Sequence, residues 1–252
     1  MIANNETYAN GYFSGLVPFW KGGGGKCSKT IRATLRDNYS HNNHGFGMWT
    51  DINNIHTLYQ VHSIARNRNS GISLEISCDA LISRDVSGSD GPTAPVWLYG
   101  GAIQIQNSRN ATVHDNDIEM MGRGHAVTLI QQHRGSGAYG PHITVRNHVH
   151  SSTIIGEFVS CGRSGSGNDF DRDTLARGNN RFEANNYHFP RTDGKEWPWF
   201  GETYNWHDYR MIAKQDVNGT LCPKSVGPQP HIDSLKWFED QKRRSRQQKS
   251  DD

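Results

Sequence analysis

One short repeat constrains this chain more than any other feature of its sequence. In each copy a β-branched or apolar residue is followed by Asn or a small polar residue, then by a glycine and a short apolar strand. From residue 40 onward the copies are 24, 22, 32 and 31 residues apart, at 40–43, 64–67, 86–89, 118–121 and 149–152. Such self-similarity is typical of a solenoid, in which each unit buries its apolar face only by stacking on its neighbours. Equivalent positions of successive units are then expected to lie side by side.

Short alternating segments accompany the repeat and indicate strands rather than helices. One set of strands is expected at 34–36, 57–59, 80–82, 112–114 and 143–145, and a second at 47–52, 71–76, 102–106 and 126–130. Period-two alternation directs one set of side chains inward and the other to the surface. Asn tolerates the left-handed conformation at corners, and stacked Asn side chains can hydrogen-bond along the axis. The pattern predicts an all-β fold, a parallel β-helix.

Composition excludes several other classes of protein. The apolar fraction of 34% and the 27 glycines argue against a helical bundle, whereas seven Trp, nine Tyr and nine Phe supply enough apolar surface to argue against disorder. A net charge of +2 gives no reason to expect a nucleic-acid partner, and the basic run at 242–246 is interpreted as a solvated tail. No apolar run of about 18 residues is present, so no membrane span is expected.

The repeat also suggests how the chain is organised. We expect β-helix coils over 1–160, a last coil with an irregular, aromatic carboxy-terminal cap over 161–225, and a largely disordered tail over 226–252. Two units are eight or nine residues too long, and insertions at 91–99 and 133–141 account for the excess. Insertions in a solenoid emerge as loops, often on the binding face. The chain opens within a repeat and without a signal peptide, so we expect either further coils or a partner to cover its amino-terminal end.

Several segments resemble the repeats of bacterial right-handed parallel β-helix proteins, namely 38–43, 45–54, 71–77, 129–132 and 180–187. The resemblance covers roughly residues 1–220 and implies a right-handed winding. Characterised members of that superfold are mostly polysaccharide lyases, glycoside hydrolases and uronate epimerases, with some phage tailspikes and adhesins. The resemblance therefore implies a polysaccharide partner and an extracellular or cell-surface location. The chain departs from these proteins before its glycine run, where it has Lys21 and they usually carry Glu.

A candidate catalytic site follows from the spacing of two acids. Asp51 and Glu75 stand at the same position after the glycine of successive units, and Lys26 precedes Asp51 by 25 residues. Neighbouring parallel strands lie about 4.8 Å apart, so the three side chains are expected to form a column if they face the same way. Two carboxyls so close raise the pKa of one of them, which suits a general acid beside an ionised partner. One alternative is a lyase or epimerase, with Lys26 as the base and a Ca²⁺ ion held by Asp51 and Glu75 to neutralise a uronate carboxylate. Another is a purely structural ladder of charges.

Residues expected to contact sugar surround this pair. Trp49 precedes Asp51 by two positions and should share its face, and aromatic rings offer sugars a flat apolar surface with a polar rim. The expected contacts are Trp49, Trp97, Tyr99, Gln106, Gln131 and Arg134. The 13 histidines show no recognised metal-ligand spacing, and no GxSxG elbow is present. The sequence favours hydrolysis or β-elimination of a polysaccharide, with a non-catalytic glycan-binding or structural β-helix, including a truncated fragment, as alternatives.

Overall fold

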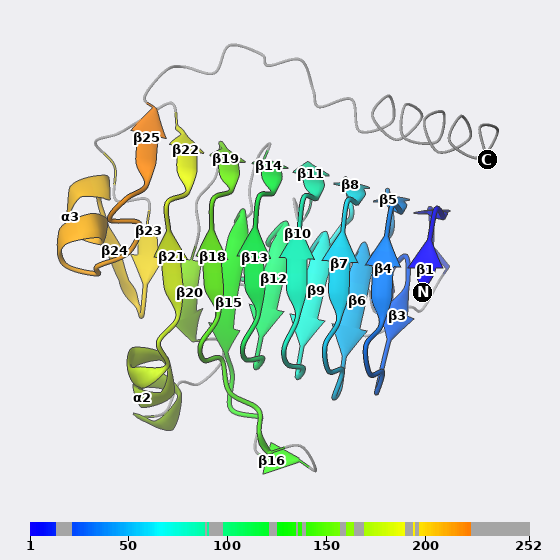
Figure 1. The fold of residues 1–252 in the computed structure, drawn as a ribbon, viewed down its shortest axis with the longest axis horizontal. Helices are drawn as coiled ribbons and strands as arrows, with labels where there is room; N and C mark the ends of the chain where they lie inside the picture. The colour runs from blue at the N-terminus through cyan, green and yellow to red at the C-terminus, as the bar shows by residue number, and fades with distance from the viewer. Residues whose placement is uncertain are drawn as a thin grey trace, which may run out of the picture.

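The chain folds into stacked coils, each of which contributes one strand to each of three parallel sheets (Figure 1). In the computed structural model the described residues are 1–13, 22–88, 90, 98–120, 125–134, 136–137, 140–156, 160–163, 169–189, 194 and 197–222. The protein is an all-β solenoid with the architecture of a parallel β-helix, as the sequence predicted. Figure 1 shows the first sheet in front and the third sheet behind it.

The first sheet has seven strands, all paired in parallel: β1 (Ile2–Ala3), β4 (Thr34–Arg36), β7 (Leu58–Gln60), β10 (Leu81–Ser83), β13 (Thr112–His114), β18 (His148–His150) and β21 (Arg181–Glu183). The second has eight: β2 (Glu6–Tyr8), β5 (Tyr39–His41), β8 (Ser63–Ala65), β11 (Val86–Gly88), β14 (Asp117–Glu119), β19 (Thr153–Ile155), β22 (Asn186–His188) and β25 (Thr220–Cys222).

The third sheet also has eight strands: β3 (Lys26–Cys27), β6 (Met48–Asp51), β9 (Ile72–Glu75), β12 (Ile103–Gln106), β15 (Val127–Gln131), β20 (Ser160–Arg163), β23 (Trp197–Trp199) and β24 (Glu202–Tyr204). Only the last pair, β23 with β24, is antiparallel in this sheet. A short antiparallel hairpin, β16 (Ser136–Gly137) with β17 (Gly140–Pro141), leaves the coil after β15. It lies within the second predicted insertion and projects away from the sheets (Figure 1).

Left-handed corners and a side-chain ladder hold the coils in register. The residue after each strand of the first sheet has positive φ, at Asn4, Asp37, Val61, Arg84, Asp115, Ser151 and Ala184. The next residue accepts a hydrogen bond from the backbone N–H of its counterpart in the preceding coil, which builds the ladder Asn5, Asn38, His62, Asp85, Asn116, Ser152, Asn185 and Asp216. The predicted stacking of Asn side chains is confirmed where two of them are neighbours, in Asn5–Asn38, Asn10–Asn43–Asn67 and Asn147–Asn180, whereas His, Asp or Ser separates the remaining Asn residues of the ladder just described. These bonds satisfy buried donors that no strand partner reaches.

The core fills the space between the three sheets, as strand alternation predicted. In the third sheet Ile72, Leu74, Ile103, Ile105 and Leu129 are fully buried and point inward. Each such side chain removed from water stabilises the fold by about 1.5–3 kcal/mol. The alternate positions of the same strands face outward and carry the polar side chains considered below.

Two strand predictions need correction. Residues 143–145 do not form the strand that follows β13, because β13 pairs with β18 and Val113 is aligned with Val149. Val145 instead makes an isolated bridge with Arg109 at a corner. The coil is 36 residues long between those two valines, whereas the expected strands at 112–114 and 143–145 are 31 residues apart, so the strand was placed five residues too early. The second sheet was also missed as a separate sheet, since its three-residue strands contain polar residues such as Ser40 and His41.

The carboxy-terminal end is capped by segments that complete the last coil. After β23 and β24 come α3 (Trp206–Met211) and β25, whereas α2 (Asp169–Arg177) precedes β21. The first sheet stops at β21, and there Gln215 and Asp216 take the place of a further strand. The Phe182 N–H donates to Gln215 Oε1 at 2.8 Å, and the Asp216 N–H donates to the Phe182 carbonyl at 2.7 Å. The predicted tail at 226–252 lies outside the described residues.

At the opposite end β1, β2 and β3 begin the three sheets. Tyr8 and Phe13 are exposed there. That a partner or further coils cover this end stays a prediction. Within the described part of the chain, no helix has the length and apolar character needed to cross a bilayer.

Candidate active site

The two predicted acids lie directly beside each other on the outward face of the third sheet. The register of β6 with β9 aligns Asp51 with Glu75, and β12 continues the column with Gln106. Both acids follow a glycine by four positions, Gly47 and Gly71, and this equal spacing brings them into register. Strand alternation directs both away from the apolar core. The central geometric prediction from the sequence is therefore confirmed.

Lys26 joins the pair from a different register than expected. It is aligned with Trp49 rather than with Asp51. Because the offset is two residues, Lys26 still faces the same side, and its Nζ lies 2.6 Å from Asp51 Oδ2. The same ammonium lies 3.6 Å from the centre of the Trp49 ring, which is a cation–π contact.

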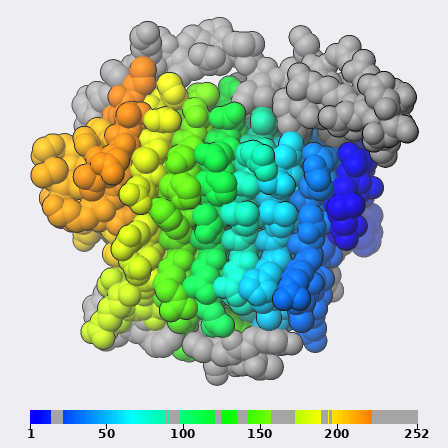
Figure 2. Space-filling view, in the orientation of Figure 1, coloured from blue at the N-terminus to red at the C-terminus, as the bar shows by residue number. Residues whose placement is uncertain are grey.

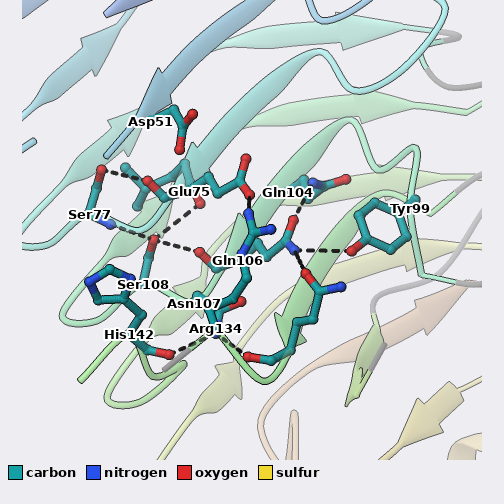
Figure 3. A network of polar contacts seen from close by, with 12 residues as sticks. Asp51, Glu75, Ser77, Tyr99, Gln104, Gln106, Asn107, Ser108, Arg134 and His142 are labelled. Atoms are coloured by element: carbon teal, nitrogen blue, oxygen red, sulfur yellow. Dashed lines mark hydrogen bonds and ion pairs between the residues drawn. The ribbon is translucent and has the colours of Figure 1, made fainter. Parts of the chain in front are cut away.

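Arg134 pairs with Glu75 from the start of the second insertion, 59 residues further along the chain. Figure 3 shows the guanidinium reaching across the sheet to the Glu75 carboxylate. Beside it Gln106 Nε2 donates to Tyr99 Oη and to Gln132 Oε1, both at 3.0 Å. The first insertion thus places Tyr99, and the second places Arg134, beside the column.

The acids of this cluster are buried and the cations are the more exposed members. The side chains of Asp51 and Glu75 are 9% exposed, whereas those of Lys26 and Arg134 are 39% and 30% exposed. Burial raises the pKa of Glu75, and the nearby charge of Asp51 raises it further, while Arg134 and Lys26 oppose the shift. A carboxyl whose pKa is raised in this way suits proton donation near neutral pH.

Four buried polar atoms on this face have no hydrogen-bond partner among the described residues: Trp49 Nε1, Asp51 Oδ1, Ser73 Oγ and Thr128 Oγ1. Ser73 and Thr128 lie in the neighbouring column, in register with Gln104 between them. Buried polar groups are rarely left unpaired, so ordered water is expected beside these atoms. Ser73 and Thr128 were not among the residues expected at the site, although the same spacing predicts their register with Trp49 and Gln104.

The predicted sugar contacts divide into three groups. Tyr99, Gln106 and Arg134 lie at the column, where Gln106 is buried and its Nε2 donates to Tyr99 and Gln132. Trp49 is only 6% exposed and packs against Phe46 with Lys26 over its ring, so it offers no free platform. Gln131 is fully buried, and its Oε1 accepts from the Thr144 backbone N–H at 2.7 Å, so it is not at the surface. Trp97 lies outside the described residues.

The residues at the column do not fit a calcium ion. Ca²⁺ takes six to eight oxygen ligands, whereas each carboxylate here already faces a cation, Lys26 or Arg134. In the part of the chain that the structure describes, no three His, Cys, Asp or Glu side chains stand together as a ready-made metal site.

Comparisons of the chain with models of protein families, with curated proteins and with solved structures found no match. The fold and the site therefore define its class, a parallel β-helix solenoid with a column of paired acids and cations on one sheet.

Proposed function

We propose that this protein hydrolyses glycosidic bonds of a polysaccharide at the column formed by Asp51 and Glu75. The observation that carries the proposal is the alignment of these acids on adjacent strands, about 4.8 Å apart along the sheet. Retaining glycosidases hold their two carboxyls about 5–5.5 Å apart, which adjacent strands approach. In this role Glu75, with its raised pKa, protonates the leaving oxygen while Asp51 attacks the anomeric carbon. Glu75 then takes a proton from the water that releases the sugar from Asp51.

The surroundings of the two acids support a role in binding a polyhydroxylated ligand. Asp51 Oδ1 has no hydrogen-bond partner among the described residues and lies at the column, whereas Ser73 and Thr128 are fully buried and, like Gln131, are not at the surface. Tyr99 extends the polar surface towards the first insertion, and its Oη accepts a hydrogen bond from Gln106 Nε2. A sugar entering the column would displace the Arg134 guanidinium from Glu75, which frees the proton donor only when substrate is present.

Elimination is the second candidate, and the exposure of the cations favours it. A ligand meets Lys26 and Arg134 before it meets the acids, so an anionic sugar is attracted first. In β-elimination from a uronate, these cations would neutralise the sugar carboxylate and Asp51 would accept the proton from the carbon beside it. The C–O bond to the leaving sugar would break as the double bond forms, and Glu75 would protonate the departing oxygen.

A binding module without turnover is the remaining candidate. It is favoured by the ion pairs that already neutralise both acids.

Polysaccharide digests separate the three candidates. Neutral and uronate-containing polymers are incubated with the wild type, and new reducing ends are measured together with absorbance from unsaturated products. Hydrolysis gives reducing ends alone, elimination gives both signals, and binding alone gives neither. Glu75→Gln and Asp51→Asn are each expected to lower turnover by about 10²–10⁴-fold. Glu6→Gln, which removes an exposed carboxylate paired with His41 on another sheet, is the matched control and should leave turnover unchanged. Turnover that survives both site variants contradicts the assignment.

A further inference from the structure

A cluster of histidines lies on the outward face of the first sheet, on a different sheet from the acids. His148 and His150 alternate on β18 and face the same side. His150 is aligned with His114 on β13 and with Glu183 on β21, so three successive coils contribute to one column. Figure 2 shows this face of the solenoid uncovered in the region of β13, β18 and β21.

The imidazoles already lie close together. The rings of His114 and His150 are parallel within 7°, with their centres 5.2 Å apart, and the centre of His148 lies 4.5 Å from that of His150. His148 Nε2 lies 3.1 Å from Glu183 Oε2, which holds the carboxylate at the edge of the cluster.

Two corner residues orient the rings in the same way. His114 Nδ1 lies 2.7 Å from Asp115 Oδ2, and His150 Nδ1 lies 3.1 Å from Ser151 Oγ. Asp115 and Ser151 occupy equivalent left-handed corners of successive coils, so the solenoid repeats the arrangement. A histidine whose Nδ1–H is held by a carboxylate or hydroxyl presents Nε2 as a free electron pair, which is how most metal-bound histidines are oriented.

We propose that His114 and His150 bind a late first-row divalent cation such as Zn²⁺ or Ni²⁺ through Nε2, with Glu183 as a third ligand. Imidazole nitrogen is a donor that these cations prefer. The site does not rest on the proposed hydrolysis and serves as a separate function of the opposite face.

Binding of the cation must draw the proposed ligands closer together. As the side chains stand, the described residues hold no preformed ligand group. Two nitrogens bound tetrahedrally to one zinc, each at about 2.1 Å, lie roughly 3.4 Å apart, which is closer than the ring centres of His114 and His150. Binding therefore requires the side chains of His114 and His150 to tilt towards each other at the surface. This rotation is accessible because the terminal torsion of histidine has broad energy wells.

Calorimetry on the untagged full chain tests the site. Zn²⁺ is titrated at about pH 7.5 into the wild type, His114→Gln, His150→Gln and Asp115→Asn. We expect one strong site per chain in the wild type, a loss of at least about 30-fold in affinity in either histidine variant, and a loss of about 10-fold in Asp115→Asn, whose carboxylate only orients His114. Mg²⁺ in place of Zn²⁺ should bind weakly, because it prefers oxygen ligands.

The matched control is His41→Gln, which removes a histidine that also has a carboxylate neighbour, Glu6, but lies on the second sheet. It should bind Zn²⁺ as the wild type does, and the melting temperature of each variant without metal shows that the fold is kept. The proposal is overturned if the wild type binds no Zn²⁺, if His150→Gln binds it undiminished, or if His41→Gln abolishes binding.

Discussion

Asp85 is the ladder position at which one substitution is expected to stabilise the fold most. Its Oδ1 accepts the His62 backbone N–H at 2.7 Å, and its own N–H donates to Asn116 Oδ1 at 2.9 Å. Its Oδ2 is buried and has no partner among the described residues. Asn at the equivalent positions uses the second atom of its side chain, since Asn38 and Asn116 Nδ2 donate to the carbonyls of Ile2 and Ile82 in the preceding coil. Asp85→Asn is therefore expected to gain a hydrogen bond to the equivalent carbonyl.

The magnitude follows from the titration of Asp85. Burial raises its pKa from 3.8 to about 8, against the opposing effects of the His62 N–H and Arg84. A carboxyl whose pKa is raised on folding contributes its full stability below its unfolded pKa, and that stability falls as the pH rises towards the folded pKa. At pH 7 the folded chain keeps a proton that the unfolded chain releases about three pH units lower, which costs roughly 4 kcal/mol at about 1.4 kcal/mol per unit. Asn has no such cost.

Thermal unfolding at several pH values measures the effect. Asp85→Asn is expected to be more stable than the wild type by roughly 4 kcal/mol at pH 7, or about 10 °C in melting temperature for a chain of this size, and by about 2 kcal/mol at pH 5. Asp117→Asn, which removes an exposed carboxylate one coil further along, is the matched control and should change little. A gain that is equal at both pH values, or a loss of stability at pH 7, would refute the reasoning.

Three further predictions concern the site and the corners. Asp51→Asn removes the like charge beside Glu75 and should lower the pKa of Glu75, which carboxyl NMR titration measures; an unchanged value would contradict their proximity. Asn185→Ala removes the acceptor of a backbone N–H and a donor to a backbone carbonyl, both at 3.1 Å, and should lower the unfolding free energy in urea by about 3 kcal/mol, whereas a loss below about 0.5 would contradict the ladder. Gly71→Ala places a methyl 2.7 Å from the Ala102 carbonyl oxygen and should lower the melting temperature, in contrast to Gly88→Ala, whose nearest neighbour is 3.8 Å away.

Part of the candidate site was predictable because it depends only on spacing. Asp51 and Glu75 each follow a glycine by four residues, so coils of nearly equal length must place them side by side. The same reasoning placed the strand at 126–130 within one residue of β15, but it failed for the next strand of the first sheet, which the lengthened coil moved from 143–145 to 148–150. The register of Lys26 also departed from the expected one, yet its two-residue offset preserved the face and therefore the ion pair.

The sequence by itself determined the architecture, the inward and outward faces of the strands and the neighbours Asp51 and Glu75. Periodicity and alternation are local properties that repeat in every coil, so they can be read along the chain. Only the tertiary structure decided that Arg134 reaches Glu75, that Trp49 lies covered and that Gln131 is used inside the protein. These outcomes depend on how segments far apart in the chain pack over a sheet, and the period of the repeat carries no information about that packing.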